Sequence, residues 1–241
     1  MRALIIGIDY IGTEYQLNGC RNDAYAVKKY MESEHRHGLD LRILTEDEDV
    51  KPTYSQVRRA IKWLMKHDGP KFFYYSGHGT QRADYSGDED DGLDEGICCL
   101  DHNMWDDHLY KLMVKPLKGR LFCIFDCCHS DTMLDMPRLK GPLSSTISSC
   151  LCCGNNEDCR EIVCISGCKD NQSSYEVRAE RKNRGLMTYN LIKAINKEPT
   201  ISYARLIEGI NRKIKKRGYP QHVEIDMHPD LDLSKRFKIT G

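Results

Sequence analysis

The sequence has no hydrophobic run that approaches the roughly 20 residues of a transmembrane helix. It also has no net charge, because 36 acidic residues balance 36 basic ones. Balanced charge gives no overall field that would attract nucleic acid or a membrane surface. The first apolar stretch, Ala3–Asp9, is too short and too soon polar for a signal peptide. We therefore expect a cytoplasmic protein that binds neither nucleic acid nor membranes.

The sequence lacks a pair of C-x2-C motifs, although the chain has 12 cysteines. Five of them lie in or beside apolar runs, as small buried residues do: Cys98, Cys99, Cys123, Cys164 and Cys168. Four others crowd one polar stretch: Cys150, Cys152, Cys153 and Cys159. Four thiolates could bind zinc, but no histidine completes a familiar finger, so loop thiols are the favoured interpretation. A reducing compartment argues against a disulfide framework.

Internal repeats and low-complexity linkers are also missing, so we expect one domain over residues 1–241. Apolar runs predict strands at Ala3–Asp9, Leu41–Thr45, Lys71–Tyr75, Gly96–Leu100, Arg120–Phe125 and Ile162–Ser166, with Phe237–Thr240 closing the sheet. Helical spacing predicts helices from an Asn22 or Asp23 cap to about Ser33, and at Tyr54–His67, His108–Val114, Gly185–Ile195 and Tyr203–Lys215. This alternation indicates an α/β fold with a mostly parallel central sheet and helices on both faces.

Two of the predicted strands end in reactive side chains. In the run FFYYSGHG the apolar residues are followed by His78, and in the run LFCIFDCCHS they are followed by Cys127 and Cys128. Active sites in such sheets lie beyond the carboxyl ends of the strands. A thiolate is the nucleophilic form of cysteine, and a nearby histidine can take its proton. The pattern predicts a Cys–His pair at one sheet edge, but local chemistry does not choose between Cys127 and Cys128.

The motifs occur in an order that resembles the metacaspases, the caspase-like cysteine peptidases of plants, fungi and protists. The matching stretches are ALIIGI, LNGCRNDA, YSGHG, GLDE, DD at 106–107, D-x-CHS, LDMP and ISGCKDNQSS. The resemblance implies a caspase-like three-layer sandwich, with a large-subunit-like segment over 1–140, a connecting loop over 141–160 and a small-subunit-like segment over 161–241. It covers nearly the whole chain and corresponds to a type I-like core without a prodomain.

The resemblance also implies an activity and the residues that carry it. Metacaspases cleave after Arg or Lys, so the expected partners are protein or peptide substrates with those residues, acted on by a monomeric enzyme. The nucleophile would be Cys128, the acid/base His78, and the oxyanion donors the amides around Gly79 and Cys128. The acidic S1 pocket would contain Cys20, Asp23, Ser76 and Asp126. Asp23 could instead cap a helix, or do both.

Calcium is the cofactor that the resemblance implies, because many metacaspases need it. The matching ligands are Asp94, Asp106, Asp107 and Asp135, and several carboxylate oxygens are what Ca²⁺ prefers. The acidic run over 84–95 does not fit the EF-hand spacing, so it is not an autonomous calcium loop. Its alternative interpretation is a solvated acidic loop.

The sequence departs from the family pattern at several positions. Cys127 stands where the family usually has Ser, and Asp131 where it has Gly. Cys127 could be a spare thiol, a redox partner or a buried substitute. The segment after Gln172 loses the usual aspartate. A scaffold without catalysis and a peptidase with another P1 preference are the alternatives, but both His78 and Cys128 are present.

Two basic stretches are not part of the expected site. The run Arg212–Arg217 ends a predicted amphipathic helix, where cations are favoured by the helix dipole, and an anionic partner is the alternative. Lys140 and the stretch Arg178–Arg184 lie in predicted loops, where a peptidase of this specificity could cleave itself.

Overall fold

A six-stranded sheet runs through the middle of the molecule, in the order β11-β8-β7-β3-β1-β2. The computed structural model describes residues 1–35, 37–83, 93–128, 134, 161–167, 175–179, 182–227 and 232–239. The strands of this sheet are β1 (Arg2–Gly7), β2 (Asp40–Leu44), β3 (Lys71–Ser76), β7 (Arg120–Asp126), β8 (Glu161–Ser166) and β11 (Glu224–Met227). All neighbours are parallel except β11, which pairs antiparallel with β8.

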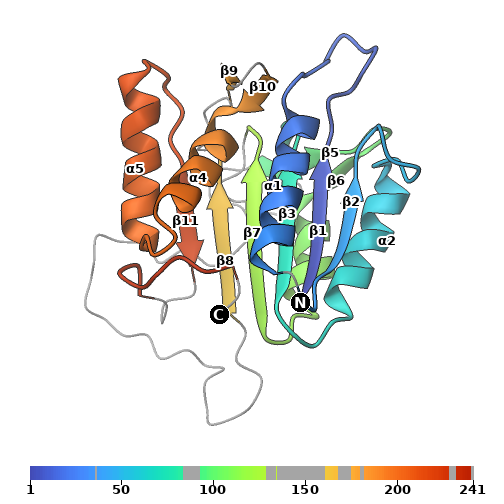
Figure 1. The fold of residues 1–241 in the computed structure, drawn as a ribbon. Helices are drawn as coiled ribbons and strands as arrows, with labels where there is room; N and C mark the ends of the chain where they lie inside the picture. The colour runs from blue at the N-terminus through green and yellow to red at the C-terminus, as the bar shows by residue number, and fades with distance from the viewer. Residues whose placement is uncertain are drawn as a thin grey trace.

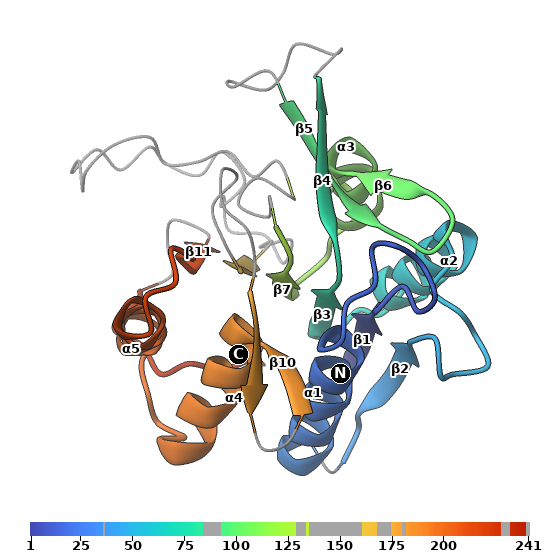
Figure 2. The ribbon, with the colours of Figure 1, turned by 90° about the horizontal axis from the view of Figure 1, so that it is seen from above.

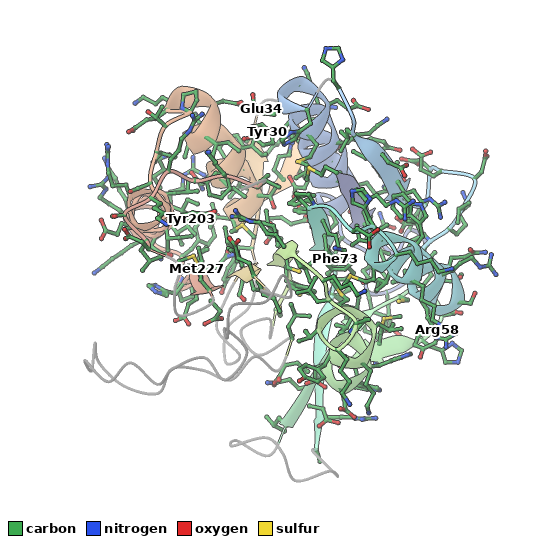
Figure 3. The ribbon with its side chains drawn as sticks, turned by 90° about the horizontal axis from the view of Figure 1, so that it is seen from below. Tyr30, Glu34, Arg58, Phe73, Tyr203 and Met227 are labelled. Atoms are coloured by element: carbon green, nitrogen blue, oxygen red, sulfur yellow. The ribbon has the colours of Figure 1, made fainter. Side chains whose placement is uncertain are left out.

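Helices cover both faces of this sheet (Figures 1 and 2). They are α1 (Cys20–Glu34), α4 (Leu186–Lys197) and α5 (Tyr203–Lys216) on one face, with α2 (Tyr54–Met65), α3 (Asp106–Leu109) and the π-helical turn η1 (Tyr110–Val114) on the other. Successive strand residues point to opposite faces, so the core has two halves. Phe72 packs toward α1 and α4, whereas its neighbour Phe73 packs toward α2. Figure 3 shows Phe73 in the interior and Arg58 at the outer surface.

Two smaller sheets adjoin the central one. The antiparallel strands β4 (Gly79–Ala83), β5 (Leu93–Cys98) and β6 (Asn103–Trp105) form one of them, which projects beyond the carboxyl end of β3 (Figure 2). The hairpin of β9 (Glu176–Ala179) and β10 (Lys182–Gly185) forms the other, and it leads directly into α4. Both sheets therefore adjoin the edge where the parallel strands end.

The expected parallel sheet is confirmed, and the predicted closing strand at Phe237–Thr240 is wrong. The strand that closes the sheet is β11, whereas the Phe237 ring packs against Phe122 and Tyr203 at centroid distances of 5.5 and 5.3 Å. The alternating apolar residues there reflect packing under the helices rather than a strand. The predicted loop around Arg178–Arg184 is also wrong, since its described residues belong to β9 and β10.

The start of α1 also differs from the sequence expectation. The helix begins at Cys20, so Asn22 and Asp23 lie inside its first turn and do not cap it. Carboxylates from elsewhere accept its first N–H groups: Asp9 Oδ1 from Cys20 N at 2.8 Å, and Glu176 Oε1 from Gly19 N at 2.6 Å. Tertiary caps of this kind have no local sequence pattern. The predicted short helix at His108–Val114 also differs, because α3 starts at Asp106 and continues as η1.

Close packing of α1 on β1 gives a test of the fold. A Cβ at Gly7 would lie 2.5 Å from the carbonyl oxygen of Cys20 and 2.6 Å from Ala24 Cβ. We expect Gly7→Ala to lower the free energy of unfolding by about 1–3 kcal/mol, because two backbone segments must separate. The control is Gly209→Ala in α5, where open space surrounds the new Cβ and a gain of about 0.5–1 kcal/mol is expected. Urea denaturation measures both, and equal effects would contradict the close approach.

Candidate active site

The register between β3 and β7 aligns the two reactive strand ends. Ser76 pairs with Asp126, and His78 and Cys128 each follow two residues later. The backbones then come together, because a Cβ at Gly79 would overlap the carbonyl oxygen of Cys128. Only glycine permits this approach. The structure thus brings His78, Gly79 and Cys128 to one edge of the sheet, as the sequence predicts.

The His78 ring is oriented by groups from the loop after β1. Its Nε2 lies 2.7 Å from the carbonyl oxygen of Tyr15, and its ring packs on that of Tyr10 at 4.7 Å. A carbonyl oxygen can only accept, so Nε2 carries a hydrogen and Nδ1 is the nitrogen left to accept a proton in the neutral ring. The Tyr10 hydroxyl accepts from the His78 backbone N–H at 2.9 Å, and the Tyr75 hydroxyl donates to the His78 carbonyl at 2.8 Å.

Cys127 and Cys128 lie in different surroundings. The Cys127 side chain is fully buried in the core half that faces α2, whereas Cys128 is half-buried at the strand end. Burial raises the pKa of the Cys127 thiol, and the neighbouring Cys128 raises it further. A thiol in that position stays protonated and out of reach of a substrate. The arrangement fits the interpretation of Cys127 as a buried substitute and favours Cys128 as the nucleophile.

The four predicted S1 residues also lie together. All four are buried: Cys20, Asp23, Ser76 and Asp126. Burial raises the pKa of the Cys20 thiol well above its ordinary value, and the neighbouring Ser76 opposes that shift. Asp23 from α1 and Asp126 from β7 converge on Gly185, where a Cβ would lie 2.8 Å from Asp23 Oδ2 and 2.5 Å from Asp126 Oδ2. Any side chain at position 185 would therefore fill the space between the two carboxylates.

Donors at the start of α4 serve both carboxylates. Asp23 Oδ2 accepts from the Gly185 N–H, and Asp126 Oδ2 accepts from Thr188 N at 3.1 Å and Thr188 Oγ1 at 2.6 Å. The first N–H groups of a helix have no partner within the helix, and its dipole favours negative charge there. This helix start is the main polar support of the pair.

These donors compensate only part of the cost of burying a negative charge on Asp23. Its pKa is raised well above the ordinary value, first by burial and then by the nearby Asp126 carboxylate, against the Gly185 N–H and the Arg184 guanidinium. The second oxygen, Oδ1, is buried and has no hydrogen-bond partner among the described residues. Arg184 Nη1 lies 3.8 Å from it, beyond hydrogen-bond distance.

The predicted calcium ligands form no tight cluster in the described part of the chain. Asp94 Oδ2 lies 2.7 Å from Arg82, Asp107 Oδ2 lies 2.8 Å from Lys111 Nζ, and Asp106 accepts the backbone N–H groups of Glu95 and Asp107. Asp135 lies outside the described residues, as do the Cys150–Cys159 cluster, Asp131 and Gln172. The three described carboxylates come from neighbouring segments and offer the oxygen ligands that Ca²⁺ prefers. Cations of the chain itself occupy two of them.

A different set of possible metal ligands was not predicted from the sequence. Asp9, Cys20 and Glu176 place one ligand atom each within 4.8 Å of one another, and within the described ranges they are the one such group. Both carboxylates already accept N–H groups at the start of α1, and Asp9 Oδ2 also pairs with Arg21 at 2.8 Å. Helix capping accounts for this cluster without a metal.

Sequence reasoning also missed the Tyr15 carbonyl, Gly185 and Thr188. A backbone carbonyl has no residue type to signal it. Gly185 and Thr188 stand in a stretch whose helical spacing conceals their contacts with β7, 62 residues away from Thr188. The available signal was a glycine at the start of the predicted helix, because glycine is a favoured N-cap residue and in the structure Gly185 precedes α4 as its N-cap.

Burial of the Asp23 carboxyl predicts a pH-dependent gain in stability on neutralisation. A carboxyl whose pKa is raised by folding destabilises the folded state as the pH rises through that raised pKa, because it ionises more easily in the unfolded chain. We expect Asp23→Asn, which keeps an acceptor for the Gly185 N–H, to melt at a higher temperature than the unmodified protein at mildly alkaline pH. The difference should disappear at acidic pH. Each kcal/mol corresponds to about 2–4 °C for a chain of this size.

The control for that measurement is Asp49→Asn, which removes one exposed carboxylate. Its melting temperature should differ little from that of the unmodified protein at either pH. A lower melting temperature for Asp23→Asn at alkaline pH would mean that attraction to Arg184 outweighs burial.

Known proteins resemble this chain in sequence and in fold. The family model for the metacaspase, peptidase C14 domain matches residues 1–137, more than half of the chain. Metacaspase-1 of Saccharomyces cerevisiae is 32% identical over 98% of this chain and 68% of its own length. Metacaspase-1B of Neurospora crassa shows the same identity and the same two coverages.

Among solved structures, a protein from Geobacter sulfurreducens superposes with a TM-score of 0.68. It is 25% identical, and the alignment covers 99% of this chain and 97% of that protein. The fold similarity thus extends over both the segment that the family model matches and the remainder. No helix in the described part of the chain is long and apolar enough to cross a membrane. The chain belongs to the metacaspase family of caspase-like cysteine peptidases.

Proposed function

We propose that this cysteine peptidase cleaves polypeptides after Arg or Lys through a Cys128 thioester. The observation that carries the proposal is the buried Asp23 carboxylate beside Asp126, with Oδ1 lacking a hydrogen-bond partner among the described residues. A buried, unpaired acceptor next to a second carboxylate favours a cationic ligand. The pocket lies at the same strand ends as His78 and Cys128.

The chemistry follows from the two reactive groups. His78 takes the thiol proton of Cys128, and Sγ attacks the carbonyl carbon of the scissile bond. The oxyanion forms against the amides around Gly79 and Cys128, which are the predicted donors. The His78 imidazolium then gives its proton to the leaving amine, and water hydrolyses the thioester with His78 again as the base. The Tyr15 carbonyl at Nε2 supports this direction of proton transfer by keeping Nδ1 as the acceptor.

Binding of a P1 cation changes the balance of charge in the pocket. A guanidinium or ammonium beside Asp23 favours the ionised carboxylate and lowers its pKa. Without a substrate, the Asp126 carboxylate adds to the effect of burial and raises the pKa of Asp23. The positive charge of the substrate would offset this repulsion between the two carboxylates. Arg184 already competes weakly for Asp23 from 3.8 Å. A substrate side chain that approaches to hydrogen-bond distance gains more than Arg184 does, because charge-assisted hydrogen bonds are strong at short range.

We also propose that calcium binds at Asp94, Asp106 and Asp107. The ion would supply charge neutralisation there and hold the loops in place. Arg82 and Lys111 must then leave, and both are substantially exposed, at 42% and 54%. The Lys111–Asp107 pair is exposed on both sides, and such pairs contribute about 0–1 kcal/mol. The Asp94 carboxylate is only 8% exposed, so the ion would have to replace the charge of Arg82 there. Strand β4, which begins at Gly79, connects this site to His78.

The two adjoining cysteines give a matched test of the nucleophile. We expect Cys128→Ala to abolish hydrolysis of a peptide reporter that ends in Arg, because the proposed nucleophile is removed and the adjoining Cys127 thiol is fully buried. Cys127→Ala should keep kcat within a few-fold and lose stability instead, since it removes packing from the core. Activity of both proteins is measured with calcium present, and unfolding is followed in parallel. Activity that survives Cys128→Ala but vanishes in Cys127→Ala would overturn the assignment.

Reporter choice separates the proposal from the alternatives. Peptides that end in Arg, Lys, Asn and Asp differ only in the P1 side chain, so kcat/KM reports the pocket. Cleavage of the Asp or Asn reporter alone would refute the cationic P1 preference and leave the peptidase activity intact. Absence of cleavage with all four reporters, in folded protein with calcium, would favour a scaffold instead.

Arg82 would compete with the proposed calcium ion for Asp94, so its removal should change the calcium concentration that activation requires. Arg82→Gln removes the guanidinium that holds Asp94, so half-maximal activation should need at least about 2-fold less calcium, because even a weak competing ion pair has that effect. The control is Arg58→Gln, an exposed arginine on α2 (Figure 3). Arg82 also lies over the Trp105 ring at 4.2 Å, so melting temperatures are compared as well. An unchanged or higher calcium requirement in Arg82→Gln would place the ion elsewhere.

A further inference from the structure

A basic cavity lies between α4 and α5, away from the catalytic pair. The two helices run side by side on the same face of the sheet (Figures 1 and 2). A cavity of about 400 Å³ between them is lined by Tyr189, Asn190 and Lys193 of α4, by Lys213 and Lys216 of α5, and by Arg217, which follows α5. We call these six residues the α4–α5 cavity. Its volume is in the range of sites that bind small molecules.

The charges around this cavity are of one sign. Four of its six lining residues are cations and none is a carboxylate. No ion pair joins any of the four to a carboxylate within the described ranges. Lysine and arginine are ordinarily interspersed with acids on protein surfaces. The concentration of cations here therefore leaves an uncompensated positive field in a concave site.

The positive charge around the cavity affects the pKa of Lys213. Its pKa is lowered, first by partial burial and then by Lys193, Lys197, Arg212 and Arg217, all of them cations. The other ionisable group at the cavity on α4, the Tyr189 hydroxyl, accepts from Lys193 Nζ at 3.2 Å and adds no charge. Cations at the end of α5 do complement the helix dipole. That explanation does not extend to Lys193, which approaches from a different helix.

We propose that the α4–α5 cavity binds a small multivalent phosphate anion. Three lysines supply mobile point charges and Arg217 supplies a planar fork, and both are used to recognise phosphate. An anion with several charges neutralises the whole cluster, whereas a single phosphate leaves most of it uncompensated. The same chemistry is offered by free oligophosphates and by phosphorylated lipid headgroups. The site is separate from Cys128, so binding can be measured without reference to peptidase activity.

Calorimetry with tripolyphosphate tests the site directly on the full chain. We expect one binding site whose affinity falls at least tenfold in the double variant Lys193→Ala/Lys213→Ala. The matched control is Lys62→Ala/Lys215→Ala, which removes the same charge from exposed positions outside the cavity. Its affinity should stay within about twofold, as expected when only a screened distant charge is lost. Equal weakening in both variants, or no measurable binding to the unmodified protein, overturns the proposal.

Lysine acetylation provides a readout that needs no variant. The lowered pKa gives Lys213 a larger neutral fraction than an ordinary lysine has, so Lys213 should react readily with an acetylating ester. Tripolyphosphate should protect Lys213 and leave Lys215 unaffected, as measured by mass spectrometry of peptides. Equal protection of the two lysines would mean diffuse ion binding and overturn the assignment.

Two further arms identify the source of the phosphate. Phosphatidylcholine vesicles are compared with and without phosphatidylinositol bisphosphate. Capture by the phosphorylated vesicles that is lost in Lys193→Ala/Lys213→Ala assigns the site to a lipid headgroup. Tripolyphosphate binding without vesicle capture assigns it to a free anion. Binding of a short RNA without binding of tripolyphosphate would contradict a small-anion site.

Discussion

Parallel pairing between β3 and β7 places Ser76 opposite Asp126, and much of the active edge depends on that register. A shift of one residue would turn every side chain of a strand to the opposite face of the sheet. Asp126 would then leave Asp23, and the loop with Gly79 would lose its approach to Cys128. The alignment is protected by the core, since Phe73 and Phe125 pack at 5.3 Å on the face toward α2. Apolar packing beside these strand ends therefore helps to fix the positions of Ser76 and Asp126, and of His78 and Cys128, which follow them.

Burial of two carboxylates in one pocket is unfavourable unless donors or cations face them. The start of α4 provides the donors, through the Gly185 N–H and through both groups of Thr188. Thr188 can donate to Asp126 while it accepts from the Tyr74 hydroxyl at 2.8 Å, so the polar chain continues into the sheet. Asp23 Oδ1 is left over. Arg184 Nε beside it is also buried without a hydrogen-bond partner among the described residues. Asp23 Oδ1 can still accept from one additional donor, and this gives the proposed P1 cation a specific place.

The parallel strands and the places of His78 and Cys128 at neighbouring strand ends could be predicted because both follow from residue type and strand position. The expectation for Asp23 and Asp126 came only from the resemblance to metacaspases. The alternation of side chains along β7 could also have predicted that Cys127 is buried, because it shares a face with Cys123 and Phe125 in the core toward α2. Other features depend on contacts between distant segments. Glu176 caps α1 from a hairpin more than 150 residues away, and the Tyr15 carbonyl contributes through its backbone. The strand β4 is polar and short, so its pairing with β5 has no apolar pattern to predict it.

The sheet of β4, β5 and β6 would connect the proposed calcium ion to His78. Gly79 starts β4, and the backbone of Cys98 at the end of β5 donates to the His78 carbonyl at 3.0 Å. Arg82 and Asp94 are directly opposite in the β4–β5 register, so the proposed ion would act on the same ladder that carries His78. Cys128 follows β7 in the central sheet, whose neighbours hold it on both sides. A cation that displaced Arg82 would thus act on the His78 side of the proposed pair, whereas Cys128 is held by the central sheet. A small displacement between two reacting groups strongly changes the rate.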